Sequence, residues 1–185
     1  RTVRLWNPAR LDPAFPPAVT GNFIRGNDPD PNAVPVEALP RALPIQTYAD
    51  GLTHPVTAVA VDKESTTLLA ASDKTLVVTD VVTQQVKRRF QGHVGCINAV
   101  ASSEKSETYV SASYEATVRI WDGRSRSYEP IQILKQAKDS VTNVHVVQDD
   151  GLALIRTGAV DGIVRTYDLR MGLIRCDDCG SSITS

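Results

Sequence analysis

The chain has few cysteines, few aromatic residues and no long apolar run. Three cysteines among 185 residues, Cys96, Cys176 and Cys179, are too few for the disulfide framework of a small secreted domain, so a reducing compartment is expected. No run of 18 apolar residues occurs, and we therefore expect no membrane span and no membrane partner. A net charge of −1 excludes the uniformly basic surface that non-specific nucleic-acid binding requires.

The sequence also lacks the motifs of common cofactor and metal sites. It contains neither the glycine-rich dinucleotide fingerprint nor the phosphate-binding loop of nucleotide hydrolases. Cys176-Asp177-Asp178-Cys179 has the spacing of half a zinc site, but no second pair of Cys or His ligands follows it. We interpret both cysteines as structural and predict no cofactor, no metal and no small-molecule substrate. A metal site completed by another part of the protein remains an alternative.

What the sequence does contain is a repeat. Four β-rich stretches each end on a two-residue signature whose second member is an acid or amide: Trp6-Asn7, Thr79-Asp80, Trp121-Asp122 and Tyr167-Asp168. Successive second members are 73, 42 and 46 positions apart. The last two steps match the period of roughly 40–45 residues at which four-stranded propeller blades repeat. The sequence therefore predicts an array of similar β units, in which surfaces rather than a pocket carry the function.

Each of the last three units divides into four short stretches with the residue pattern of strands. Apolar residues alternate with small or polar ones, as they do in half-buried strands, and turn residues separate the stretches. The predicted strands lie at 56–61, 68–71, 75–80 and 86–90, then at 97–100, 109–113, 117–121 and 131–134, then at 141–147, 152–158, 163–167 and 173–176. No segment has an apolar period of 3.6 residues, so almost no helix is expected.

A proline-rich segment separates the first signature from the others. Nine of the eleven prolines lie between residues 8 and 44, and because proline cannot donate to a strand ladder we predict a long surface loop there. The chain starts on a strand pattern at 2–6 without methionine and ends on another at 182–184, so we interpret it as a fragment. The predicted division is a blade end at 1–7, an inserted loop at 8–43, blades at 44–90, 91–134 and 135–176, and a further blade starting at 177–185.

The middle unit carries the pattern of a known family. Gly92-His93 precedes its first strand, Ser111 lies on the second, Glu115 in the next turn and Trp121 on the third. This pattern resembles the WD-repeat β-propeller family, in whose blades such side chains form a chain of hydrogen bonds. The resemblance implies this chain at His93, Ser111, Glu115 and Trp121, with Thr157 and Asp161 retained in the next unit and Asp73 alone in the preceding one. It implies an all-β fold of four-stranded antiparallel blades, about three whole and two partial, forming part of a propeller.

Longer phrases narrow the resemblance. Trp121-Asp122-Gly123-Arg124-Ser125-Arg126-Ser127 with Glu129-Pro130, and Val160-Asp161-Gly162 with Arg165-Thr166-Tyr167-Asp168-Leu169-Arg170-Met171-Gly172, resemble the mitogen-activated protein kinase organizer family. These are WD-repeat scaffolds that are also described as associated with the spliceosome. The resemblance implies a non-enzymatic scaffold in the cytoplasm and nucleus that assembles kinase-cascade components, acts in pre-mRNA splicing, or does both. The expected partners are proteins of these assemblies, with RNA only as an indirect partner.

Two other classes of function remain open. An RNA-contacting subunit of a ribonucleoprotein such as the spliceosome is the main alternative, and its candidate contacts are Arg119, Arg124, Arg126, Arg165 and Arg170. A hydrolase is the other, because His93, Ser111 and Glu115 include the residue types of a nucleophilic triad. Catalysis needs an exposed serine oxygen, whereas a serine inside a blade is covered, so we predict no catalytic residue.

The resemblance also implies where partners bind, namely at the mouth of the propeller. Tyr114, just before the turn acid, is expected there, with Ser72 and Val160 at the equivalent positions. Three pairs of residues flank the starts of the inner strands: Pro55 and Thr57, Cys96 and Asn98, Ser140 and Thr142. We predict these residues as a partner-binding face with Tyr114 as its anchor, because aromatic side chains dominate interface hot spots. An ordinary exposed tyrosine is the alternative.

Overall fold

The computed structural model describes residues 2–11, 42–103, 107–149 and 152–184, and within these ranges every regular element is a β-strand. The strands form three four-stranded sheets and one two-stranded sheet. The all-β fold of a partial propeller, predicted from the repeat, is confirmed. The described residues contain no helix long and apolar enough to cross a membrane.

The strands follow the chain in order. The two-stranded sheet pairs β1 (Val3–Leu11) with β2 (Ala42–Tyr48). The first four-stranded sheet contains β3 (Val56–Val61), β4 (Thr67–Ser72), β5 (Thr75–Asp80) and β6 (Val86–Gln91). The second contains β7 (Ile97–Ser102), β8 (Thr108–Ser113), β9 (Val118–Asp122) and β10 (Gln132–Leu134). The third contains β11 (Val141–Asp149), β12 (Leu152–Ala159), β13 (Ile163–Asp168) and β14 (Gly172–Asp178).

The chain divides into two compact units. One is Arg4–Thr47, and the other combines Arg1–Val3 with Tyr48–Ser185. In the smaller unit β1 continues through Leu11 and β2 begins at Ala42, so the ends of the inserted loop predicted at 8–43 are strand residues. Pro8 lies in β1, which pairs with no strand other than β2 among the described residues, and proline is found mainly in such edge strands. The rest of the predicted loop lies outside the described residues.

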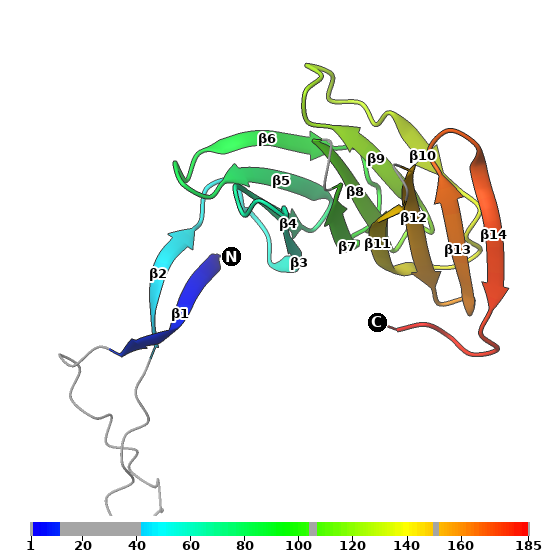
Figure 1. Cartoon of the computed structure of the whole chain (residues 1–185), viewed down its shortest axis with the longest axis horizontal. Coiled ribbons are helices and arrows are strands. Elements are labelled where there is room, and N and C mark those ends of the chain that lie inside the picture. The colour runs from blue at the N-terminus through cyan, green and yellow to red at the C-terminus, as the bar shows by residue number, and fades with distance from the viewer. Residues whose placement is uncertain (1, 12–41, 104–106, 150–151, 185) are drawn as a thin grey trace, which may run out of the picture. The chain divides into compact units, whose positions relative to one another are not determined.

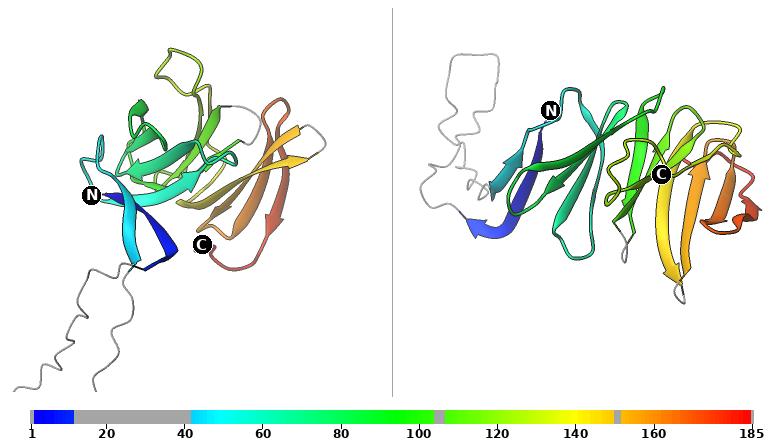
Figure 2. Two further views of the ribbon diagram at one scale, coloured as in Figure 1. Left: turned by 60° about the vertical axis from the view of Figure 1, so that its left-hand side comes forward. Right: turned by 90° about the horizontal axis from the view of Figure 1, so that it is seen from above.

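In the larger unit, each four-stranded sheet is an antiparallel meander. Consecutive strands are neighbours in each sheet, from β3 to β6, from β7 to β10 and from β11 to β14 (Figure 1). The first strands of the sheets, β3, β7 and β11, lie next to one another. The sheets themselves follow one another in chain order (Figure 2). This is the arrangement of consecutive propeller blades, and β3, β7 and β11 are the inner strands.

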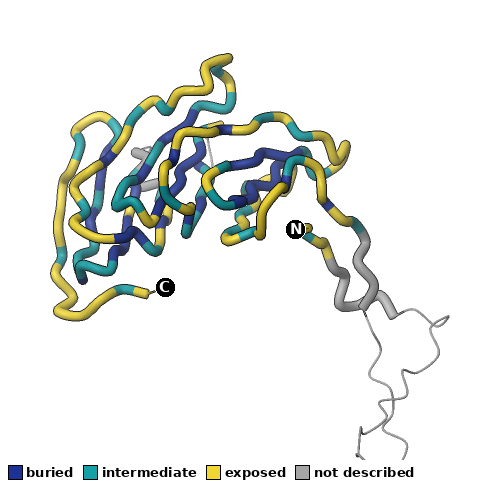
Figure 3. Tube along the Cα trace, turned by 180° about the vertical axis from the view of Figure 1, so that it is seen from behind, coloured by how far each residue is buried: buried dark blue, intermediate teal, exposed yellow. Residues whose placement is uncertain are grey.

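The two larger hydrophobic cores of the described residues lie between neighbouring sheets, whereas a small third one, of Leu52, Ala70 and Val77, lies within the first repeat. One core joins Leu69, Ala71, Leu76, Val78 and Phe90 of the first sheet to Ile97, Val100, Tyr109 and Trp121 of the second. Another joins Val110, Ala112, Val118, Ile120 and Leu134 of the second to Val141, Val144, Val146, Ile155, Ala159 and Tyr167 of the third. The middle strands carry most of the buried residues, and every residue of β4 is buried (Figure 3). A strand packed on both faces needs apolar or small residues throughout.

The third sheet departs from the predicted boundaries. Strand β14 runs to Asp178, beyond the blade boundary predicted at residue 176. No strand forms at 182–184, although the residue pattern predicts one. A strand requires a ladder partner, and these residues pair with no strand in the described part of the chain. Their backbone instead contacts the third sheet, where the Ile183 N–H donates to the carbonyl oxygen of Ala159 at 3.3 Å.

Packing between sheets makes a stability prediction. The ring of Phe90, 1% exposed, lies 5.1 Å from the ring of Trp121 in the next sheet. Replacing Phe90 by alanine removes this contact and leaves a cavity, so we expect a loss of about 3–5 kcal/mol in the free energy of unfolding. Urea denaturation measures the loss. Val82, 79% exposed, is the control, and Val82→Ala is expected to change stability by less than about 0.5 kcal/mol. Equal effects of the two substitutions would contradict packing between sheets.

Candidate functional site

The second sheet contains a continuous chain of side-chain hydrogen bonds. The indole N–H of Trp121 donates to Ser111 Oγ at 2.9 Å. Ser111 Oγ lies 2.7 Å from His93 Nε2, and His93 Nδ1 lies 2.6 Å from Glu115 Oε1. The chain therefore runs from strand β9 through β8 to the loop before β7 and ends in the β8–β9 turn. It ties four parts of one blade together.

The proton positions in this chain follow from its donors and acceptors. Ser111 already accepts the N–H of Trp121, so its own hydroxyl proton is free to donate to His93 Nε2. His93 Nδ1–H then donates to the Glu115 carboxylate. With a neutral imidazole, the Trp121 N–H, the Ser111 hydroxyl and both His93 nitrogens all have hydrogen-bond partners. Burial lowers the pKa of His93, which agrees with a neutral imidazole. Ser111 is fully buried, so its oxygen cannot reach a substrate as a nucleophile would.

Glu115 connects the β8–β9 turn to the loop before β7. Its Oε2 accepts the backbone N–H of Val94 at 2.8 Å and that of Gly95 at 3.3 Å. Its Oε1 accepts the hydroxyl of Thr117 at 2.6 Å as well as the His93 N–H. Desolvation by burial opposes ionisation of the carboxyl, but these hydrogen bonds together lower its pKa to about 2. Glu115 is thus an ionised anchor.

In the third sheet, the turn after the second strand is likewise bound to the loop before the inner strand, but an arginine takes part in place of the histidine. Asp161 accepts the backbone N–H of Lys138, in the loop before β11, at 3.0 Å. The Arg165 guanidinium donates two hydrogen bonds to the Asp161 carboxylate, at 2.6 and 3.1 Å. The Arg165 bond is the main cause that lowers the pKa of Asp161 to about 2. Thr157, which the resemblance placed in this chain, hydrogen-bonds the Tyr167 hydroxyl.

The first sheet has no such chain. Leu52, at the position of His93, is buried and apolar, and so is Ala70, which the strand register puts at the position of Ser111 in place of the predicted Leu69. Asp73 does not join a chain with them: its carboxylate accepts the thiol of Cys96, in the next repeat, at 2.9 Å. The tie between turn and loop is made instead by Ser72, whose Oγ accepts the His54 N–H at 3.1 Å and donates to the His54 carbonyl at 2.9 Å.

Ser72 is therefore not at the position predicted for it. It pairs with Val56, as Ser113 pairs with Ile97 in the second sheet, so its equivalent there is Ser113 rather than Tyr114. The reason is the turn that follows: Ser72 pairs directly with Thr75, whereas Ser113 bonds to Thr117, one residue further along. Counting back from the turn acid does not reveal this one-residue difference.

The predicted partner-binding face separates into exposed and covered residues. Tyr114 is 70% exposed, and Pro55, Thr57 and Cys96 are also exposed. Val160, Asn98 and Thr142 are half-buried. Ser72 and Ser140 are 1% and 5% exposed, which corrects the prediction that they face a partner. Sequence reasoning also missed Val94, 73% exposed, which adjoins His93 in the loop before β7.

Three residues of the predicted face join neighbouring repeats. Each is the second residue of an inner strand, β3, β7 or β11, and we call these three residues the inner-strand links. The Thr57 hydroxyl donates to the Ile97 carbonyl at 2.6 Å, and the Asn98 amide donates to the Val141 carbonyl at 2.9 Å. The Thr142 hydroxyl donates to the Ile183 carbonyl at 2.9 Å. The sequence does show a polar residue near the start of each inner strand. The prediction assigned these residues to partner binding and did not foresee that they link neighbouring repeats.

The residues considered for chemistry do not converge on a ligand site. Within the described ranges, no three His, Cys, Asp or Glu side chains lie where they could hold a metal ion together. Cys176 and Cys179 are both exposed, which corrects their interpretation as packing residues. Cys176 lies inside β14 rather than at its end, because that strand continues to Asp178.

Comparisons with known proteins agree with the arrangement of the sheets. Residues 44–80 and 84–122 match the family model described as WD domain, G-beta repeat. The WD repeat domain-containing protein 83 homolog of Dictyostelium discoideum is 31% identical over an alignment of 133 residues, gaps included, that covers 58% of this chain and 41% of that protein. The pre-mRNA-splicing factor cwf17 of Schizosaccharomyces pombe is 32% identical over 102 residues, 55% of this chain and 28% of that protein.

A shorter and more similar match lies in WD repeat domain-containing protein 83 of Rattus norvegicus. It is 49% identical over 61 residues, 33% of this chain and 18% of that protein. The chain thus spans less than half the length of each of these three relatives.

The hydrogen-bond chain predicts a specific cost for losing its central hydroxyl. Ser111→Ala leaves the Trp121 N–H and His93 Nε2 buried without partners, so we expect a loss of about 1–3 kcal/mol in the free energy of unfolding. In a Trp121→Phe background the same substitution is expected to cost less, because one of the two orphaned groups is gone. A double-mutant cycle by urea denaturation measures this coupling. Additive effects would contradict the chain, and Ser127→Ala at an exposed serine is the control.

Stability is expected to fall on mild acidification. Because burial lowers the pKa of His93 below its ordinary value of 6.5, the unfolded state binds more protons than the folded state just below that value. The free energy of unfolding then rises with pH in that window. Glu115 adds to this at lower pH, since its stabilisation is lost as pH falls from its ordinary 4.5 towards 2. Urea denaturation between pH 7.5 and 5.5 should show a flatter slope for His93→Gln than for the wild type. Equal slopes for the wild type and His93→Gln would contradict the assignment.

Proposed function

We propose that this chain, which carries WD40 repeats and is built as consecutive propeller blades, is part of a non-enzymatic scaffold that holds other proteins together. One observation carries the proposal: the polar groups of the blades are engaged in structural bonds. Ser111 and His93 are buried in such bonds, and Asp161 is paired with Arg165. Tyr114 and Val94, which remain exposed, lie in a turn and a loop between strands, where rigid scaffolds present binding residues.

Pre-mRNA splicing is the setting we favour for this scaffold. Its support is the similarity to a protein named as a splicing factor, combined with the resemblance carried by the Arg-Ser-Arg and Asp-Leu-Arg-Met-Gly phrases. Assembly of a mitogen-activated protein kinase cascade is the second setting, and it rests on that resemblance alone. Taken together, the two settings imply a location in the nucleus and the cytoplasm. The partners would be protein components of these complexes.

Direct RNA binding is a weaker candidate because two of the five arginines predicted to contact RNA are paired with carboxylates of this chain. Arg165 is 3% exposed and paired with Asp161, and the Arg119 side chain is largely buried with its Nε 3.4 Å from Glu115 Oε1. Arg124, Arg126 and Arg170 remain exposed. Salt-dependent binding of the intact protein to RNA would support this candidate, and an absence of binding would remove it.

Tyr114 and Val94 are the proposed anchor of the partner-binding face. They belong to the two segments that Glu115 ties together, the β8–β9 turn and the loop before β7. The Tyr114 N–H also donates to the Cys96 carbonyl at 2.9 Å, which fixes the start of the turn. A large exposed aromatic side chain on a fixed backbone loses little entropy on binding, which makes it an effective interface anchor.

Substituting this anchor tests the proposal. The intact protein is used to recover partners from cell extract, and the recovered proteins are identified and quantified by mass spectrometry. Tyr114→Ala is expected to reduce recovery of the main partners about tenfold or more, since truncating a hot-spot aromatic costs about 2 kcal/mol or more. Met171→Ala, at a residue 82% exposed on another turn, is the control and should retain them.

The identity of the recovered proteins separates the two settings. Splicing subunits support the favoured setting, and kinases with their regulators support the second. Recovery of neither class, or recovery that Tyr114→Ala leaves unchanged, would contradict the corresponding part of the proposal.

A further inference from the structure

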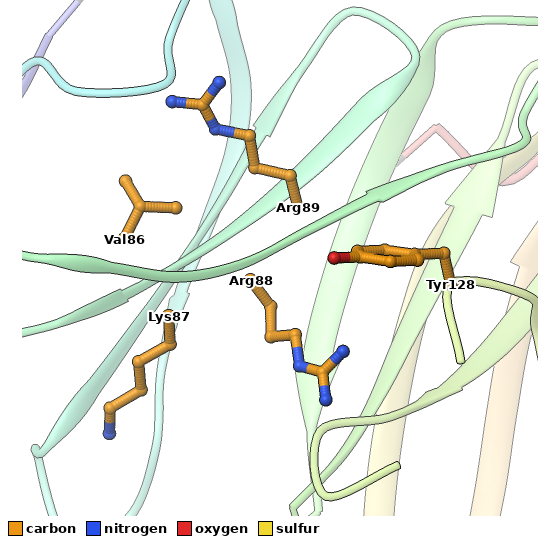
Figure 4. Close-up of a pocket in the computed structure, with 5 residues that line it drawn as sticks. All are labelled: Val86, Lys87, Arg88, Arg89 and Tyr128. Carbon is orange, nitrogen blue, oxygen red and sulfur yellow. The ribbon is translucent and has the colours of Figure 1, made fainter. Parts of the chain in front are cut away.

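A cleft of about 440 Å³, which Tyr114 does not line, lies between the first and second sheets. It is lined by Val86, Lys87, Arg88 and Arg89 of β6 and by Tyr128, in the segment between β9 and β10. Figure 4 shows Lys87 and Arg88 extending to one side of β6 and Arg89 to the other, with the Tyr128 ring beside the strand. Strand and segment come from consecutive blades, so the cleft exists only where two blades meet.

The cleft is positively charged in a chain whose net charge is −1. Three consecutive cations line it, and the exposed Arg124 and Arg126 lie in the same segment as Tyr128. Lys87 forms an ion pair with Asp80 at 3.1 Å, and its side chain keeps 43% of its surface exposed. An acidic ligand would therefore be attracted to this cleft, and a basic one would be repelled.

The cleft keeps its shape without a ligand. An Arg88 N–H donates to the carbonyl oxygen of Ser125, and the Arg88 guanidinium carbon lies 5.9 Å from the centre of the Tyr128 ring. Arg88 thus holds the segment between β9 and β10 beside β6. A guanidinium has five N–H donors, so this one keeps donors for a carboxylate after binding Ser125. A preformed site loses less entropy when it binds a ligand.

Strand β6 also offers backbone groups along the cleft. It is the last strand of its sheet and pairs with β5, while its other edge pairs with no strand in the described ranges. The N–H and C=O groups of such an edge are available to an added strand. The cations of β6 provide the usual protection against non-specific pairing, because they repel basic segments and leave an acidic one as the matching occupant.

We propose that this cleft binds an extended acidic peptide segment of a partner protein, which adds to the free edge of β6 and places its carboxylates beside Lys87 and Arg88. The free backbone edge favours a peptide over RNA, because RNA has no peptide backbone that could pair with a β-strand. Tyr128 already contacts Arg88, so its ring is not free on that side to stack on a base. This goes beyond the proposed function, since a scaffold could act through Tyr114 with this cleft empty.

Binding of short labelled peptides to the intact protein tests the proposal. The probe is a seven-residue fluorescein-labelled peptide of alternating glutamate and valine, and fluorescence anisotropy measures its affinity. Alternation puts all glutamates on one face of an added strand. We expect binding that weakens as salt increases, and at least tenfold weaker binding of the peptide with lysine in place of glutamate. Equal affinity for the two peptides would overturn the proposal.

Substitutions locate the binding on the protein. The double variant Lys87→Glu and Arg89→Glu, which spares Arg88 and the contact it makes, is expected to weaken binding of the glutamate peptide at least tenfold. The control reverses two exposed lysines on other loops, Lys74→Glu and Lys135→Glu, and should weaken it less than twofold. Equal effects of the two double variants would show a general charge effect and overturn the site.

A modified peptide tests the added strand without altering the protein. Methylation of alternate backbone nitrogens, in each of the two registers, removes the donors on one edge and leaves the charge unchanged. At least one register is expected to lose binding tenfold or more. Unchanged binding of both, or tighter binding of a seven-nucleotide oligouridylate than of the glutamate peptide, would contradict pairing with β6. None of these measurements depends on Tyr114, so failure here and failure of the proposed function are distinguishable.

Discussion

Burial of one sheet against the next is the interaction on which the rest of this structure depends. A four-stranded sheet of this kind cannot cover its own apolar faces, so Phe90 of the first sheet packs on Trp121 of the second, and Ile120 of the second shares a core with Ile155 of the third. Neither core belongs to a single repeat. The turn and loop contacts set the spacing and angle at which these faces meet, and every surface of the array follows from that geometry.

The repeats keep one connection while changing its chemistry. In each, a side chain in or just before the turn after the second strand holds the loop that precedes the inner strand. Glu115 does this together with His93, Asp161 together with Arg165, and Ser72 through two bonds to His54. Arg165 supplies a positive partner in the blade where no histidine is available. A carboxylate buried at such a turn needs its hydrogen bonds filled, and imidazole, guanidinium and backbone N–H groups can all fill them.

The sequence predicted the fold better than it predicted the surface. Period and alternation are properties of the strands themselves, so the three sheets and their strand order could be derived, and His93, Ser111, Glu115 and Trp121 could be named from one spacing pattern. The role of Arg165 could not be derived from the sequence, because its pairing with Asp161 depends on how its side chain folds back to the turn. Ser72 was misplaced by a turn one residue shorter, and the links made by Thr57, Asn98 and Thr142 depend on the neighbouring repeat, which no single repeat reveals.

The inner-strand links have a direction. Thr57, Asn98 and Thr142 each donate a hydrogen bond towards the carboxyl-terminal side, to the backbone carbonyl of Ile97, Val141 and Ile183 in turn. Each of these links has a main-chain oxygen as acceptor, which every amino acid provides, although Asn98 also donates to Ser140 Oγ at 3.0 Å. If the repeat containing β7 to β10 were excised, the hydroxyl of Thr57 would meet the carbonyl of Val141 with the same chemistry. This one hydrogen bond could therefore persist when a repeat is duplicated or lost in evolution, whereas the apolar side chains that pack at the new interface would have to fit one another anew.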